Sequence, residues 1–205
     1  MDKRLKKFFL IIIVLIIIGL GISLIVLADL GPDSISLLCQ GIHEHMPGTF
    51  GIATLAYNVA IILIALLFAK KYLGAGTVLY AVLIGAFIDL FMLICRPFDI
   101  ENQSVYIRFM VFILGQCFYS LGLSLLIKLN LGMNALDALM TKLSDLTHIQ
   151  YMYFRVAADF SYCVIGYLLG GTFGVGTVIS VLFTGTLVTF FGKVFKWEKL
   201  IKLED

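Results

Sequence analysis

An aspartate stands inside an apolar stretch of this sequence, where an ionisable side chain is costly. Asp89 lies in "GAFIDLF", within the apolar run 76–95. Such a side chain usually faces the interior of a helix bundle or a water-filled cavity, where it can bind a proton or a cation. The alternative is a structural aspartate near the membrane surface that accepts hydrogen bonds from a neighbouring helix. The sequence leaves both interpretations open.

A second group of charged residues lies further along the chain. Arg155 and Asp159 are four positions apart, so they share one face of a helix and can form an ion pair. Asp137, one helix earlier, can compete for the same arginine. If Arg155 faces a cavity instead, its planar guanidinium is suited to binding a carboxylate or phosphate.

Motifs for catalysis or metal binding are missing from the sequence. His43 and His45 do not form HExxH, the cysteines form no CxxC pair, and no serine lies in a nucleophile elbow. We therefore predict no enzyme, no catalytic residue, no cofactor and no metal site. The two GxGT segments lack the lysine of a phosphate-binding loop, and we expect them to pack helices closely. Their residues are Gly74, Gly76, Thr77, Gly174, Gly176 and Thr177.

The composition determines the kind of fold that positions these residues. Hydrophobic residues make up 61% of the 205-residue chain and charged residues only 14%, whereas a soluble domain averages roughly 45–50% and 25%. One globule cannot bury this excess, so we predict an all-α polytopic membrane protein whose main partner is the lipid bilayer. A net charge of +2 gives no indication of nucleic-acid binding.

Six apolar stretches are long enough to span a bilayer, and two shorter amphipathic segments lie between them. We expect Asp29 and Asn130 to cap the two short helices. These helices either lie in the membrane interface or are re-entrant half-helices whose positive N-terminal ends, at Asp33 and Asn134, face an anion. The expected spans are 8–28, 50–69, 76–95, 108–127, 151–169 and 173–192, and the short helices 32–46 and 133–147.

The two halves of the sequence resemble each other. "GAGTVLYAVLIGAFIDLF" at 74–91 recurs as "GVGTVISVLFTGTLVTFF" at 174–191, and "DLGPD" at 29–33 as "NLGMN" at 130–134. Each half holds three spans, and an odd number of spans requires the halves to face opposite ways in the membrane. We therefore predict an inverted three-plus-three repeat. The expected parts are a first repeat at 1–95, an external linker at 96–106, a second repeat at 107–195 and a cytoplasmic tail at 196–205.

The basic residues predict the orientation of the chain. If the N-terminus is cytoplasmic, all lysines and arginines except Arg96 and Arg108 lie on the cytoplasmic side. This distribution follows the positive-inside rule. We therefore expect a multi-pass protein of the bacterial plasma membrane with both termini in the cytoplasm.

The pattern "LLGGTFGVGTVISVLFTG" at 168–185 and the form "LGxxxxDALM" at 131–140 identify a resemblance over residues 10–195. The chain resembles the YczE/YyaS/YitT family of bacterial integral membrane proteins, especially its YczE-like branch. This resemblance implies a membrane location and a duplicated helical fold, in a group that is largely uncharacterised. Where members often carry Pro-Trp and Pro-Arg, this chain has Ser34-Ile35 and Ala135-Leu136. The residues that match the family are Gly170, Gly171, Gly174, Gly176, Thr177, Gly185, Asp89, Asp137 and Arg155.

Two functions fit these features. In the first, the protein carries a small solute or ion between the repeats, Asp89 binds a cation or proton, and Arg155 with the helix starts at Asp33 and Asn134 orients an anionic group. In the second, the protein is a non-transporting scaffold or regulator of another membrane complex. A homo-oligomer is compatible with either function.

Overall fold

The described part of the chain consists of helices joined by short connections. The computed structural model describes residues 3–129 and 134–195, and within these ranges it contains eight α-helices and no strand. The predicted all-α fold class is confirmed. The helices are α1 (Lys3–Leu27), α2 (Ser34–His45), α3 (Phe50–Phe68), α4 (Ala75–Cys95), α5 (Val105–Leu129), α6 (Ala135–Thr147), α7 (Tyr151–Leu168) and α8 (Val175–Val194). Short 3-10 helices are η1 (Lys70–Tyr72), η2 (Arg96–Phe98) and η3 (Ile100–Asn102).

Five of the described helices, α1, α3, α4, α5 and α8, are long and apolar enough to cross a membrane. The chain is therefore a multi-pass membrane protein. The predicted span 151–169 corresponds to α7, which is not among the five. Arg155 and Asp159 lie in the middle of α7 and lower its hydropathy.

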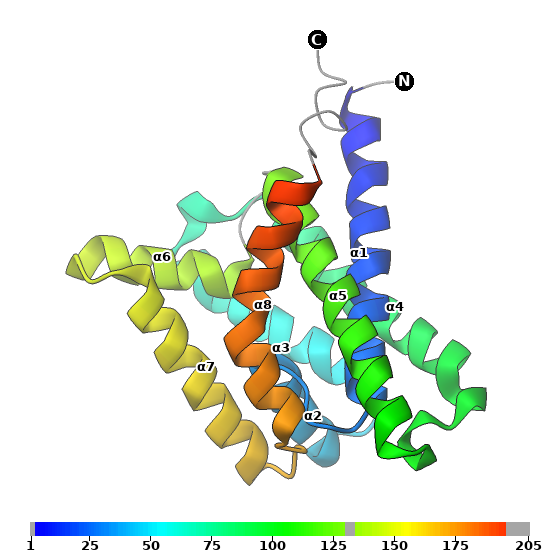
Figure 1. The fold of residues 1–205 in the computed structure, drawn as a ribbon. Helices are drawn as coiled ribbons and strands as arrows, with labels where there is room; N and C mark the ends of the chain where they lie inside the picture. Colours follow the sequence, from blue (N-terminus) through cyan, green and yellow to red (C-terminus); the bar gives the residue numbers. More distant parts are fainter. Residues whose placement is uncertain (1–2, 130–133, 196–205) are drawn as a thin grey trace.

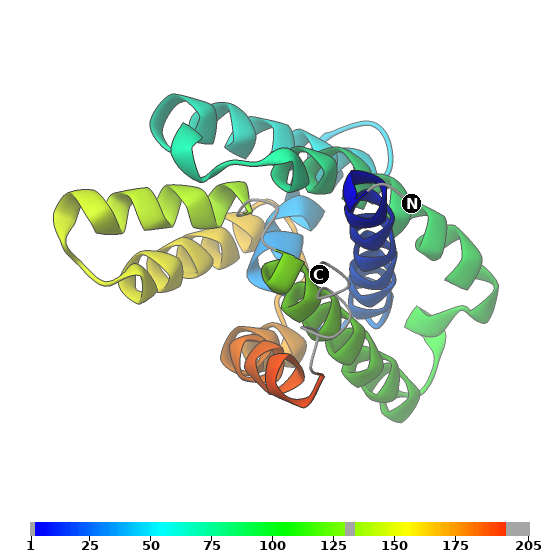
Figure 2. The same ribbon diagram turned by 90° about the horizontal axis from the view of Figure 1, so that it is seen from above.

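Helix α1 packs along α5 and against α4, as Figures 1 and 2 show. The two helices approach closely where α1 carries Gly21. A Cβ atom on Gly21 would lie only 2.4 Å from the backbone nitrogen of Tyr119, so the contact requires glycine. Five apolar side chains of α1 are fully buried in this core: Ile11, Val14, Leu15, Ile18 and Ile25.

The short helices pack against helices of the other half of the chain. Helix α2 lies against α7, where the backbones of Gly41 and Gly166 approach each other, and α6 lies against α3. Half of the residues of α2 are buried, whereas the buried residues of α6 are confined to its first turn. The short helix of each half thus contacts the other half of the chain. These contacts bring the starts of α2 and α6 into the interior of the protein.

The last helix of each half packs differently. Helix α4 lies against α3 through the facing pair Gly51 and Gly85, and a Cβ atom on Gly85 would lie 2.3 Å from the carbonyl oxygen of Gly51. Helix α8 lies against α5, where Gln116 donates a hydrogen bond of 2.6 Å to Thr184. At Gly185 on α8, no described atom lies within 4 Å of the position of a Cβ atom.

Candidate ligand-binding site

An aspartate and an asparagine cap the two short helices. Ser36 N–H donates to Oδ2 of Asp33 at 3.4 Å, and Leu136 N–H donates to Oδ1 of Asn134 at 3.3 Å. The prediction that Asp29 caps the first helix is wrong. Asp29 lies one turn earlier with a φ of 47°, and its carboxylate pairs with Arg108 at 2.9 Å.

The corresponding prediction for Asn130 falls outside the described residues. Pro32 directly precedes the capping residue Asp33.

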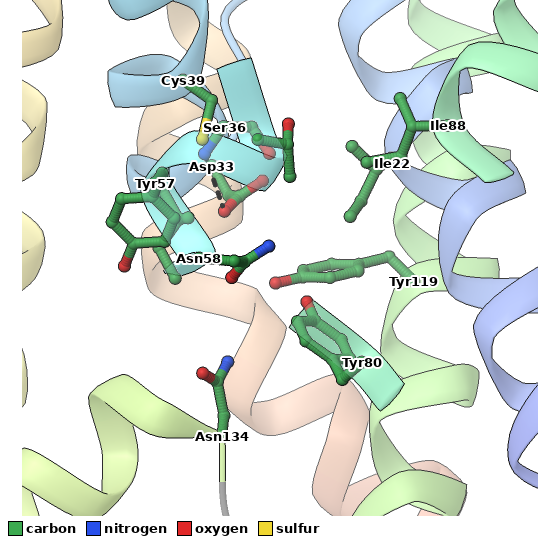
Figure 3. A pocket seen from close by; sticks show the side chains of 12 residues that line it. Ile22, Asp33, Ser36, Cys39, Tyr57, Asn58, Tyr80, Ile88, Tyr119 and Asn134 are labelled. Atoms are coloured by element: carbon green, nitrogen blue, oxygen red, sulfur yellow. Dashed lines mark hydrogen bonds between the residues drawn. The ribbon is translucent and has the colours of Figure 1, made fainter. Parts of the chain in front are cut away.

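A small cavity lies between the starts of the two short helices (Figure 3). It measures about 20 Å³, which is room for about one water molecule. Helices from both halves contribute to its wall, because Asp33 and Asn134 both line it. The other lining residues are Ile22, Ile35, Ser36, Cys39, Thr54, Tyr57, Asn58, Tyr80, Ile88 and Tyr119.

Asp33 is the acidic group of this cavity. Its side chain belongs to a residue that is only 8% exposed, and Oδ1 finds no hydrogen-bond partner among the described residues. Burial raises the pKa of the Asp33 carboxyl above its usual value, although the hydrogen bonds from Ser36 oppose this rise. A buried carboxylate oxygen without a partner costs free energy.

The polar residues of the cavity have counterparts in the second half of the chain. Helices α2 and α6 begin at residues 34 and 135, and α3 and α7 at residues 50 and 151, so both pairs are offset by 101 positions. At this offset three polar positions are neutral in the first half, which has Asp33, and charged in the second half, which has Asn134. The pairs are Asp33 with Asn134, Ser36 with Asp137, Thr54 with Arg155, and Asn58 with Asp159.

The charged set of the second half forms one connected network. Arg155 donates from Nη1 to Asp137 at 2.7 Å and from Nε to Asp159 at 2.9 Å. Ser34, at the start of α2, donates to the other oxygen of Asp159 at 2.6 Å, and Tyr151 donates to Asp137 at 2.6 Å. Arg155 therefore forms its ion pairs within the protein. It connects α7 to α6 through Asp137, and the Ser34 hydroxyl connects Asp159 to α2.

The structure places Asp89 away from this cavity, at the start of α3. Its carboxylate accepts hydrogen bonds from Thr49 Oγ1 at 2.5 Å and from Gly51 N–H at 2.8 Å. Asp89 is therefore a cap on the N-terminus of α3, where a negative charge also interacts favourably with the helix dipole. This is the structural alternative that the sequence left open, and a role in cation binding stays a prediction.

Removing this cap should reduce stability without touching the cavity. We expect Asp89→Ala to lower the free energy of unfolding by about 1–2 kcal/mol, because two donors at the start of α3 lose their acceptor. Thr189→Ala is the control at the equivalent position, since Thr189 bonds only to Gly185 of its own helix. Thermal unfolding in detergent measures both variants, and equal losses would contradict the capping role.

The GxGT residues begin the last helix of each half. Gly74 N–H donates to Thr77 Oγ1 at 3.2 Å, and Gly174 N–H to Thr177 Oγ1 at 3.5 Å. Gly176 N–H also donates to the carbonyl oxygen of Leu30 at 2.7 Å, so the start of α8 rests on the segment before α2. These residues, with Gly76 buried at the start of α4, cap and pack helices around the cavity.

Sequence reasoning did not identify several residues of the cavity. Asn58 stands in the apolar segment "LAYNVA", and its offset of 101 from Asp159 is a signal that could have identified it. Tyr80 and Tyr119 carried no such signal, because a tyrosine in an apolar helix is common in a core. Among the described residues, no group of three or more His, Cys, Asp or Glu side chains is arranged to hold a metal ion.

Comparison with known proteins supports the membrane assignment. The model of a family of unknown function (DUF6198) matches residues 5–193. An uncharacterized protein of Haemophilus influenzae is 30% identical over 186 residues, covering 91% of this chain and 83% of that protein. The uncharacterized membrane protein YczE of Bacillus subtilis is 26% identical, covering 86% of this chain and 80% of its own length.

A further relative in Bacillus subtilis is the uncharacterized protein YyaS, which is 24% identical over 178 residues, 86% of this chain and 88% of that protein. No solved structure matches the chain.

Proposed function

The chain belongs to the YczE/YyaS-like family of membrane proteins (family of unknown function DUF6198), and we propose that it carries a small solute or ion through the cavity between its two halves. The observation that carries this proposal is the meeting of two helix starts, Asp33 and Asn134, at one small cavity. Transporters built from inverted repeats bind their substrates near the middle of the membrane, where discontinuous helices end.

The proposed architecture is six spans arranged as an inverted three-plus-three repeat. Helix α7 has 18 residues, which is about 27 Å at 1.5 Å per residue and close to the thickness of the hydrocarbon layer. Its charged residues suit a sixth span, because Arg155 and Asp159 bind partners on α6 and α2 and need not face lipid. Helix α2 would then be re-entrant, since its first turns are buried by protein.

We place both ends of the chain in the cytoplasm of a bacterial cell. The start of α1 and the end of α8 lie at the same end of the molecule in Figure 1. Tyr72 of η1 donates a hydrogen bond to Asp145 of α6, so this connection and the second short helix share one side. With the lysine-rich ends on that side, the arrangement follows the positive-inside rule.

The cavity favours a carrier over a scaffold. A scaffold requires only packed helices and paired charges, such as those around Arg155. It gains nothing from Asp33, whose unsatisfied buried oxygen reduces stability. Proteins retain costly polar groups within membranes mainly where they bind substrates or ions.

A single cysteine beside the cavity tests the carrier without requiring knowledge of its substrate. We expect Ile35→Cys to react with small, membrane-impermeant methanethiosulfonate reagents from both sides of the membrane, because a carrier exposes its site alternately. Sealed vesicles of either orientation provide the measurement. The native cysteines Cys39, Cys95, Cys117 and Cys163 are first replaced by alanine or serine.

Two matched reporters define the sides. Phe68 and Phe98 are each 66% exposed, at opposite ends of the proposed spans. Phe68→Cys should react only from the cytoplasmic side and Phe98→Cys only from the outside. If the controls behave in this way and Ile35→Cys reacts from one side or from neither, the carrier proposal fails.

A further inference from the structure

We propose that the ligand of the cavity is a small monovalent cation held by Oδ1 of Asp33. This inference names the substrate class and takes its functional meaning from the proposed carrier role. It depends on an observation at one atom of a residue that lines the cavity, because Oδ1 of Asp33 is buried and has no partner among residues 3–129 and 134–195.

The charge of the site favours a cation with a single positive charge. Arg155 is the nearby arginine, but its guanidinium is bound to Asp137 and Asp159 at 2.7 and 2.9 Å. Among the residues that the structure describes, Asp33 is therefore left as one carboxylate without an ion-pair partner. One positive charge neutralises it, whereas a divalent ion would leave an excess charge in a medium of low dielectric constant.

The start of α2 opposes the rise in pKa that burial causes in Asp33, and it directs the carboxylate. Ser36 N–H donates to Oδ2 of Asp33, and the positive end of this 12-residue helix favours the ionised form. With Oδ2 engaged by the helix, Oδ1 is the oxygen that remains for a ligand in the cavity.

Other side-chain oxygen atoms line the cavity beside Asp33. Figure 3 shows the hydroxyl groups of Tyr80 and Tyr119 pointing toward the amide of Asn58, between Asp33 and Asn134. Carboxylate, amide and hydroxyl oxygens are the ligands that hard cations prefer. The five side chains come from both halves of the chain, so a bound cation would join the two halves.

The size of the cavity limits the cation. A volume of about 20 Å³ holds one particle about the size of a water molecule. Sodium, potassium and ammonium ions without their hydration shells fit this description. Choline, which carries the same charge on a much larger group, does not.

Thermal unfolding of the purified full-length protein tests this inference. We expect the unfolding temperature to rise and saturate with sodium, potassium or ammonium chloride, relative to choline chloride at equal ionic strength. A ligand that binds only the folded state produces this saturating behaviour. In Asp33→Asn the apparent affinity should fall at least tenfold, while asparagine still caps α2.

Two further variants separate the role of charge from that of structure. Exchanging the two caps, in Asp33→Asn with Asn134→Asp, moves the carboxylate across the same cavity and should restore saturable binding. Asp29→Asn removes a carboxylate of the same loop outside the cavity and should keep the cation response of the native chain. Retained binding in Asp33→Asn, or its loss only in Asp29→Asn, would overturn the assignment.

The remaining outcomes distinguish this inference from the proposed function. If stability depends on pH but is identical in sodium, potassium, ammonium and choline salts, Asp33 is a proton site and the inference fails. If Ile35→Cys reacts from both sides of the membrane without any cation response, the carrier stands and the inference falls. If cations bind while Ile35→Cys reacts from one side only, the cation site stands and the carrier falls.

Discussion

Replacing Gly85 with alanine is expected to lower the free energy of unfolding by about 2 kcal/mol or more, because overpacking a helix contact typically costs about 1–3 kcal/mol. Helices α3 and α4 touch where this glycine meets Gly51. A Cβ atom on Gly85 would lie 2.3 Å from the carbonyl oxygen of Gly51, and that backbone cannot move aside without separating the helices.

The second half of the chain offers the matched control. Gly185 lies 100 residues after Gly85, at the equivalent place in α8, and has no described atom within 4 Å of a Cβ position. Gly185→Ala should therefore be neutral or stabilising by up to about 1 kcal/mol, as expected for alanine in a helix. Unfolding curves in one detergent measure both variants. Equal losses would mean that α8 is packed as tightly as α4, contrary to the structure.

Replacing Arg155 with methionine is expected to cost about 2 kcal/mol. This loss of unfolding free energy lies between the losses measured for exposed and for fully buried ion pairs. The side chains of Arg155, Asp137 and Asp159 are 30%, 33% and 18% exposed. Two carboxylates then lose their common partner in a largely apolar environment. Arg155→Lys should recover only part of this loss, because one ammonium group cannot reproduce the fork that spans both aspartates.

Neutralising the whole network tests the cause of that loss. Arg155→Met combined with Asp137→Asn and Asp159→Asn removes the unpaired charges and should recover most of the stability. Thermal unfolding of the three proteins in the same detergent decides the point. A triple variant less stable than Arg155→Met alone would show that the loss does not come from unpaired carboxylates.

The sequence predicted the helices well because their signals are local. Apolar runs located α1, α3, α4, α5 and α8, and the spacing of leucines and isoleucines located the two short helices. For α7 the prediction used the same apolar pattern, although Arg155 and Asp159 reduce its hydropathy. The partners of these charges on α2 and α6 become visible only in three dimensions.

The sites were predicted less completely, for physical reasons that differ between residues. Asp33 and Asn134 were identified as helix starts, but their convergence depends on α2 packing against α7 and α6 against α3, which no local pattern reveals. Asp89 stood out because an aspartate is unusual in an apolar span. The hydrogen bonds that explain it come from Thr49 and Gly51, on another helix.

Two-sided labelling of Ile35→Cys, with and without the small cation, tests the central claim most directly. The account predicts reaction from both sides, and a cation-dependent change in the two rates that is absent in Asp33→Asn and unaffected by choline. This result would show that the cavity is accessible from both sides of the membrane and that Asp33 mediates its response to the cation. Reaction confined to one side in every salt, with Phe68→Cys and Phe98→Cys reporting their own sides, would contradict the account.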